Sequence, residues 1–251
     1  MVRPENILLL QVKNIKAKYK SESVEYIWVC SQLKAVRQDM MIQHIENAFT
    51  VDTYETHARI ALENGDLNEF NQCQTQLKKL YEKLGHDEKA MKNVPEFVSY
   101  RILYTVFLMG NRKYEGGSSD MYELLWEVLG NEGDDVIKAE EVDHALRVRS
   151  AVATEDYVTF FKLLDTSPKM SSYLMSLVMP QIRFAGLKQI VKCFKPSVEV
   201  DFVVNQLGLS DEEGEEYLNS CKAKVVEGKI VCDKEGFASL TLPDDEEGNL
   251  I

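Results

Sequence analysis

The chain is 251 residues long, with 45% hydrophobic residues, 29 lysines and arginines, 41 acidic residues and a formal net charge of −12. A chain of this length can build its core without disulfides, as one large domain or two small ones. The negative charge argues against a surface that attracts nucleic acid or anionic membranes as a whole, so any such contact needs a local basic face.

The cysteines and the apolar runs indicate an intracellular protein. Five cysteines stand far apart without a CxxC pair, which predicts reduced thiols used for packing rather than disulfides or a zinc ribbon. The longest purely apolar runs, such as residues 7–10, are too short to span a bilayer. The N-terminus also lacks the small-residue cleavage site of a signal peptide.

The first part of the chain predicts helices over residues 4–20 and 24–46, and then an αα-hairpin whose two amphipathic helices meet at Gly65-Asp66. Gly65 suits the left-handed residue that ends the first helix. Asp66 and Glu69 predict a capping box at the start of the second helix. The predicted buried stripe consists of Tyr54, His57, Ala58, Ala61 and Leu62, and then Leu67, Phe70, Cys73, Leu77, Leu80 and Leu84.

Residues 144–164 repeat this pattern, with Glu155-Asp156 in place of Gly65-Asp66. Helical pairs that recur along a chain indicate a stack, so we expect a mainly α fold of stacked helical hairpins, a TPR- or PCI-like solenoid. Apolar spacing adds helices over 95–109, 120–129 and 169–194, with a loop over 111–120.

The pattern changes after Pro196. Residues 200–207 predict a short helix, and Ser210 with Glu213 predicts a capping box that opens a helix to about Lys222. Residues 225–231 then predict a β-hairpin that turns at Glu227-Gly228. This order is that of a winged helix. The predicted domains are a helical-repeat part over 1–196, a winged helix over 197–240 and an acidic disordered tail over 241–251.

No motif for catalysis, cofactor binding or metal binding is present. The four histidines form no HExxH, and neither GxSxG nor GxGxxG occurs, so we expect no enzyme. His57 is interpreted as a hydrogen-bonded packing histidine, with a catalytic or metal role as the alternative. The amide run at residues 71–76 is either a hydrogen-bonded solvated surface, which we favour, or a patch that faces a partner.

Two sets of residues are candidates for interaction. Lys188, Lys192 and Lys195 recur at i, i+4 and i+7 opposite an apolar side that includes Phe194, with Arg183 as a structural ion-pair partner. A stripe of this kind is usually solvated, and phosphate contact is the alternative. The nucleic-acid-binding candidates are Lys188, Lys192, Lys195, Lys222, Lys224 and Lys229, and the partner-binding candidates are Val225, Val226, Ile230 and Val231.

The predicted winged helix is better suited to protein than to DNA. Its second helix begins DEEGEE at residues 211–216, and five carboxylates at the position where such helices read the major groove would repel phosphates. We therefore expect this part of the chain to dock another protein.

Residues 35–81 strongly resemble the signature block of the SAC/GANP/THP family of PCI-type proteins, especially in RQDMMIQ, YETHARIAL and EFNQCQTQLKKLY. Within that family the chain looks closest to the THP branch, which includes the leukocyte-receptor-cluster-member homologues. The resemblance continues through VRPENIL, FVSYRILY, HALRVRSAV and LKQIVKCFKPSVEVDFVVNQLGL, so it covers nearly the whole chain.

The resemblance implies a non-enzymatic nuclear scaffold in messenger RNA biogenesis: transcription elongation, splicing or export. It further implies a second PCI-domain partner resembling COP9-signalosome subunits, a small acidic DSS/SEM-type protein, and binding of RNA or single-stranded nucleic acid by the complex. The alternative is a purely protein-binding subunit of a proteasome-lid or signalosome-like assembly. The resemblance leaves open whether Met1 is the native start.

Overall fold

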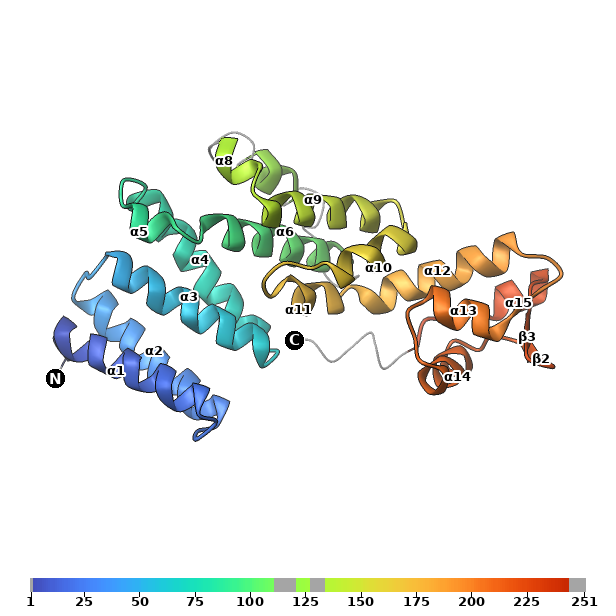
Figure 1. The fold of residues 1–251 in the computed structure, drawn as a ribbon, viewed down its shortest axis with the longest axis horizontal. Coiled ribbons are helices and arrows are strands. Elements are labelled where there is room, and N and C mark those ends of the chain that lie inside the picture. Colours follow the sequence, from blue (N-terminus) through green and yellow to red (C-terminus); the bar gives the residue numbers. More distant parts are fainter. Residues whose placement is uncertain (1, 111–120, 127–133, 244–251) are drawn as a thin grey trace. The chain divides into compact units, whose positions relative to one another are not determined.

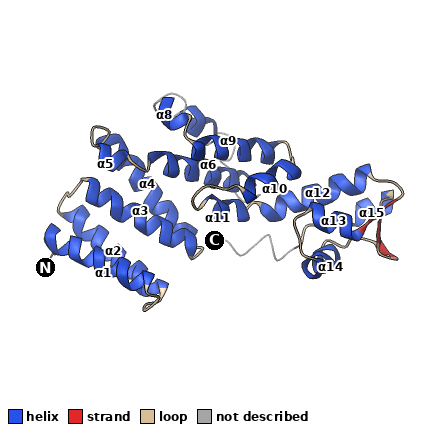
Figure 2. Cartoon of the chain, viewed as in Figure 1, coloured by secondary structure: helices blue, strands red, loops and turns tan. Residues whose placement is uncertain are grey.

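The structure is a computed structural model that describes residues 2–110, 121–126 and 134–243 (Figure 1). It divides into two compact units, Met1–Phe97 and Val98–Ile251. The described residues are mostly helical, with one small three-stranded antiparallel sheet near the C-terminus (Figure 2). The predicted mainly α fold with a small β-hairpin is confirmed.

The first unit is built from helical pairs. α1 packs against α2, α2 against α3, and α3 against α4. The α1–α2 core contains Leu8, Ile15, Leu33 and Met40, which recur at helical spacing and are at most 1% exposed. The helices are α1 (Glu5–Lys20), α2 (Tyr26–Ile42), α3 (Ala48–Glu63), α4 (Leu67–Lys83), α5 (Glu88–Met91) and the first residues of α6 (Val94–Gly110).

The turn between α3 and α4 has the predicted backbone. Gly65 has a φ of 71°, the left-handed region that favours glycine. Asp66 caps α4 by accepting a hydrogen bond from the amide of Glu69. The reciprocal half of the predicted capping box is wrong, because the Glu69 carboxylate turns inward and binds Arg37 and Lys34.

The second unit contains most of α6 and a further series of short helices. The predicted helix over 169–194 is two helices, interrupted just before Pro180, which has no amide proton to donate. Of the helix predicted over 120–129, residues 121–126 are helical and the others lie outside the described residues. The predicted loop over 111–120 and the tail from residue 244 also lie outside them. The elements are α8 (Asp134–Ile137), α9 (Glu140–Ala153), α10 (Tyr157–Asp165), α11 (Ser171–Ser176), α12 (Met179–Cys193), β1 (Ser197–Glu199), α13 (Val200–Gln206), α14 (Asp211–Ser220), β2 (Val225–Val226), β3 (Lys229–Val231) and α15 (Lys234–Ser239).

The C-terminal sheet has the strand order β1-β3-β2. The predicted hairpin is β2–β3, and the sequence did not reveal β1, whose Val198 lies opposite Ile230. Gly214 lets α14 approach α13, since a Cβ there would lie 2.4 Å from a methyl group of Val204. The hydrophobic cluster beneath the sheet draws on Leu187, Ile190 and Val191 of α12 as well as on Val198, Val203, Val204, Leu207, Tyr217, Leu218 and Ile230. This core contains residues from both sides of the predicted domain boundary at residue 196. The division into a helical-repeat part and a winged helix stays a prediction.

Candidate interaction surfaces

The outer edge of β2 is the most exposed apolar part of the sheet. Since β3 is the central strand, β2 pairs on one side only among the described residues. The side chains of Val225 and Val226 are 43% and 50% exposed. An edge strand with exposed β-branched side chains is a template for pairing with another chain. The site predicted at these two valines stays a prediction that the geometry permits.

The assignment of Ile230 to the partner-binding residues is wrong. It is 1% exposed and packs in the cluster beneath the sheet, so its side chain holds the fold and is not available to a partner. Successive residues of a strand point to opposite faces. The side chain of Ile230 therefore points to the opposite face from those of Lys229, which is exposed, and Val231, which is half-buried.

The predicted lysine stripe is only partly helical. α12 ends at Cys193, so Lys195 lies beyond the helix and only Lys188 and Lys192 share one of its faces. Lys192 and Lys195 are exposed, whereas Lys188 is half-buried with its Nζ 4.9 Å from the centre of the Phe184 ring. The free cations of this segment are therefore fewer than the sequence suggests.

The lysines around β2 and β3 also differ in how far their charge is available to a ligand. Lys222 and Lys224 are exposed. Lys229 is exposed too, but its Nζ lies 2.9 Å from Oε1 of Glu199, which offsets its charge locally.

Phe194 was expected on the buried side of α12, and that expectation is wrong. The helix ends one residue earlier, and the Phe194 ring is 43% exposed. It lies against the ring of Phe202, which is 42% exposed, with 5.4 Å between the ring centres. Sequence reasoning missed this exposed aromatic pair, although a phenylalanine between two lysines just before Pro196 was a signal for it.

Arg183 is structural, but its hydrogen bonds go to main-chain oxygens. Its Nε donates to the carbonyl oxygen of Leu207 at 3.2 Å and its Nη2 to that of Gly208 at 3.0 Å. The guanidinium therefore caps the C-terminus of α13, where unpaired carbonyl groups favour a cation.

The helix α14 presents carboxylates outward. Ser210 and Glu213 form the predicted capping box, and hydrogen bonds from Ser210 hold the pKa of Glu213 below its usual range. The remaining acidic side chains of the helix are exposed, which keeps this face unfavourable for a phosphate backbone.

The first unit contains a buried charged cluster that the sequence did not reveal. Arg37 donates from Nη2 to Oε1 of Glu69 and from Nη1 to Sγ of Cys73, the latter at 3.0 Å. Lys34 reaches the other oxygen of Glu69 at 2.7 Å. Glu69 is 1% exposed, so these two cations stabilise a carboxylate that burial alone would destabilise.

His57 lies beside this cluster without the predicted hydrogen bond. It is fully buried, and neither ring nitrogen has a hydrogen-bond partner among the described residues. Burial, reinforced by the positive charge of Arg37, lowers the pKa of His57 to about 3, so the imidazole is neutral at physiological pH.

The donor atoms of His57, Glu69 and Cys73 all lie within 4.8 Å of one another, a spacing that can hold a metal ion. The residues around them fit a metal poorly. The Arg37 guanidinium already occupies the position of the cation, and burial raises the pKa of the Cys73 thiol to about 12, which keeps it protonated. We therefore interpret the cluster as structural.

The amide run divides between the interior and the surface. Gln74 is 7% exposed and donates to Oδ1 of Asn71, whereas Asn71, Gln72 and Gln76 are exposed.

Within the described ranges, no helix has the length and apolarity needed to cross a membrane.

Comparison with known proteins confirms the resemblance. The sequence profile of the SAC3/GANP family matches residues 2–227. The leukocyte receptor cluster member 8 homolog of Xenopus laevis is 41% identical, over 84% of this chain and 24% of the relative. The THP3 homolog of Schizosaccharomyces pombe is 41% identical, over 88% of this chain and 52% of the relative. Protein THP3 of Saccharomyces cerevisiae is 30% identical, over 95% of this chain and 49% of the relative. The chain spans about half or less of the length of these relatives.

Proposed function

The chain belongs to the SAC3/GANP family, and from this premise we propose that it is a non-enzymatic scaffold subunit of a nuclear complex in messenger RNA biogenesis. In this proposal it pairs with a second PCI-domain protein resembling COP9-signalosome subunits, joined by a small acidic DSS/SEM-type protein. The complex binds RNA, and this chain adds a few contacts to it.

The exposed edge of β2 is the observation that carries the partnering role. Strand addition at such an edge supplies main-chain hydrogen bonds, and the side chains of Val225 and Val226 supply apolar contact. A stable interface usually buries more than about 1,200 Å². The short strand can therefore only be the centre of a larger contact that includes α14 and the β2–β3 turn.

Substitution tests this role better than truncation does. Removing the residues after Pro196 would expose Leu187, Ile190 and Val191 of α12, so loss of binding could reflect unfolding. In the double variant V225K/V226K the side chains are exposed and the fold should persist. We expect the partner to be lost in copurification, whereas the control L10K, at a residue that is 63% exposed in the first unit, retains it. Full partner binding by the double variant would place the interface elsewhere.

The RNA contacts of this chain are proposed at Lys192, Lys195 and the Phe194–Phe202 pair. Exposed cations beside exposed aromatic rings are typical of single-strand binding, because phosphates meet the cations and bases stack on the rings. The net charge of −12 means that the partner must supply most of the positive surface.

The two kinds of contact give different salt dependence. Each phosphate contact steepens the slope of log affinity against log salt by roughly 0.7 for a single strand. The variant K192E/K195E of the reconstituted complex should therefore bind unrelated RNA sequences more weakly, with a slope flatter by up to about 1.4. The variant F194A/F202A should weaken binding with the slope unchanged. If both variants bind RNA as the wild type does, these residues form only a solvated surface.

A purely protein-binding subunit of a proteasome-lid or signalosome-like assembly is the second candidate, supported by the acidic face of α14. The two functions share one architecture and differ in affinity for nucleic acid. Failure of the reconstituted wild-type complex to retard a labelled single-stranded RNA would favour this second function.

A further inference from the structure

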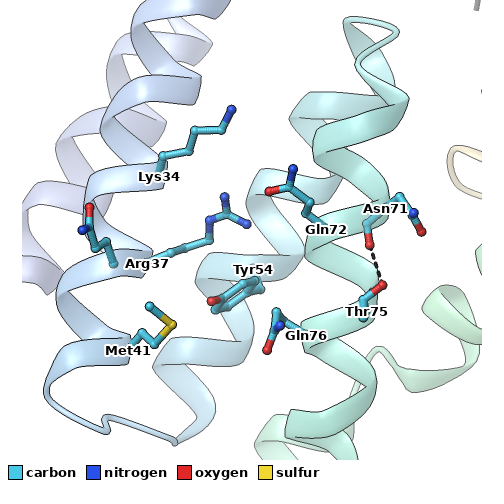
Figure 3. Close-up of a pocket in the computed structure, with 9 residues that line it drawn as sticks. Lys34, Arg37, Met41, Tyr54, Asn71, Gln72, Thr75 and Gln76 are labelled. Carbon is cyan, nitrogen blue, oxygen red and sulfur yellow. Dashed lines mark hydrogen bonds between the residues drawn. The ribbon is translucent and has the colours of Figure 1, made fainter. Parts of the chain in front are cut away.

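A groove on the first unit is used by none of the roles above. It lies between α2 and α4 over Tyr54 of α3 and has a volume of about 490 Å³ (Figure 3). The lining side chains are Lys34, Arg37, Gln38 and Met41 from α2, Tyr54 from α3, and Asn71, Gln72, Thr75 and Gln76 from α4.

The floor of the groove is held in place. Arg37 and Tyr54 are each 9% exposed, and the guanidinium lies 5.1 Å from the centre of the tyrosine ring. The ion pair with Glu69 fixes Arg37 from below. A ligand would therefore meet a floor whose side chains lose little freedom on binding, which favours affinity.

The rim is rich in amides and free of acid. Gln38, Gln72 and Gln76 are exposed, and no lining residue is acidic although the chain carries 41 acidic residues. Beneath the rim, Lys34 and Arg37 share the carboxylate of Glu69, and Asp66 also interacts electrostatically with Lys34. The Lys34 side chain is nevertheless 50% exposed, so its ammonium group is accessible from the groove. In Figure 3 the side chains of Lys34 and Gln72 extend into the space between the two helices.

We propose that this groove binds an extended, acidic peptide segment of a partner protein. A glutamine side chain offers a donor and an acceptor together, as a peptide group does, so the exposed amides suit a main chain. Gln72 and Gln76 lie one helical turn apart, about 5–6 Å. That spacing is close to the roughly 6.6 Å between residues on the same side of an extended strand. Every second peptide group of the bound segment can therefore meet one of these two amides.

The side chains of the peptide have partners as well. An acidic side chain of the peptide can form an ion pair with the half-exposed ammonium group of Lys34. Met41 is 67% exposed at the end of the groove, and its flexible thioether can accommodate a neighbouring apolar residue. The groove therefore favours a carboxylate near an apolar side chain.

RNA fits this groove less well. Tyr54 and Arg37 are too deeply buried to stack a base, and Lys34 is the one exposed cation of the lining. A single strand needs exposed rings and several cations along its backbone.

The test starts from selection on the full chain. Random 12-residue linear peptides displayed on phage are enriched at neutral pH, and the synthetic winners are titrated by fluorescence polarisation. We expect enriched peptides to carry Asp or Glu near an apolar residue, and the variant Q72A/Q76A to weaken them at least tenfold. Alanine is a better helix former than glutamine, so the folded state of this variant should persist. The matched control Q206A, at an exposed glutamine of the second unit, should bind as the wild type does.

Two outcomes overturn the proposal. One is that no peptide is enriched, or that the enriched peptides bind the Q72A/Q76A variant with unchanged affinity. The other is that a 12-nucleotide single-stranded RNA binds the full chain and loses affinity in the same variant, which would assign the groove to nucleic acid. Neither result bears on the partnering of β2, so the two proposals fail independently.

Discussion

The hairpins α3–α4 and α9–α10 have the same turn and different interiors. In the first, the amide of Asp66 donates to the carbonyl of Ala61 at 2.9 Å; in the second, Asp156 donates to Ala151 at 2.8 Å. The caps Asp66 and Asp156 have nearly equal dihedrals, φ −81° and ψ 82° against φ −80° and ψ 83°. The geometry of this turn is therefore set by its main-chain hydrogen bonds and by the capping aspartate.

Beyond the turn, the hairpins diverge. The left-handed residue is Gly65 in one and Glu155, with φ 53°, in the other. The α3–α4 interior buries Glu69 and His57, whose ring nitrogens accept or donate no hydrogen bond among the described residues. In α9–α10 the Nε2 of buried His144 lies 2.8 Å from the carbonyl oxygen of Leu163. A turn defined by the backbone thus leaves the interior free to carry either a buried ion pair or a histidine that hydrogen-bonds the main chain. The following variants test that separation.

The largest effect should follow from removing Arg37. In R37M the carboxylate of Glu69 stays buried with Lys34 as its remaining cation, and breaking a buried pair in this way costs about 3–5 kcal/mol. The double variant R37M/E69L should recover most of that loss, because an apolar pair needs no partner. Urea unfolding followed by Trp28 fluorescence in a W126F background reports the first unit alone. Equal stability of the wild type and R37M would show that the cluster contributes nothing.

The second effect is the acid sensitivity that buried His57 gives to the first hairpin. The folded pKa of His57, about 3, lies below its ordinary value of 6.5 because burial disfavours the imidazolium. A lowered pKa contributes stability that is complete above pH 6.5 and is lost as the pH falls towards 3. Between pH 7 and pH 5 this amounts to about 2 kcal/mol.

The variant H57L isolates this contribution. Burial raises the pKa of Glu55, which therefore acts in the opposite direction, and the difference between wild type and variant removes it. We expect the loss of stability between pH 7 and pH 5, measured by urea unfolding, to be smaller in H57L. Parallel pH profiles for the two proteins would contradict the burial of a neutral His57.

The local features of both hairpins could be predicted from the sequence, and the charged cluster could not. Gly65 and Asp66 act within a few residues, so their roles follow from residue type. Arg37 and Glu69 are 32 residues apart, and no local pattern identifies them as partners. β1 is too short, at three residues, to show a period of two.

The candidate surfaces show the same limit. The exposure of Lys192 and of Val225 could be predicted from spacing and from the hairpin. The exposure of Phe194 depends on α12 ending one residue earlier than the apolar pattern suggests, and helix ends are uncertain by a residue or two. The burial of Ile230 was accessible from strand alternation, which needed only the register of the hairpin.

The third effect concerns the left-handed residue itself. A Cβ at Gly65 would meet nothing within 4 Å, so G65V tests backbone strain without a clash. A β-branched residue at positive φ should cost about 1–2 kcal/mol. E155V should cost less, because Glu155 already carries a side chain at φ 53°. Equal losses in melting temperature for the two variants would contradict the difference that we draw between the turns.

The smallest effect should be a gain in stability. Glu155 is exposed and holds a conformation that costs an L-residue roughly 1–2 kcal/mol, and E155G removes that cost. Glycine loses more freedom on folding, by about 0.5–1 kcal/mol, so the net gain should be near 0.5 kcal/mol. The hydrogen bond from Gln189 to Glu155 goes to the main-chain oxygen and survives the substitution.

The control is the same change at exposed Glu216, inside α14, which should instead cost about 1 kcal/mol. Helical dihedrals are available to both residues there, so only the freedom of the unfolded chain differs. Opposite signs in differential scanning calorimetry would confirm that Glu155 replaces the glycine of the first hairpin at a cost, and a loss of stability in both variants would show that the Glu155 side chain contributes to the turn.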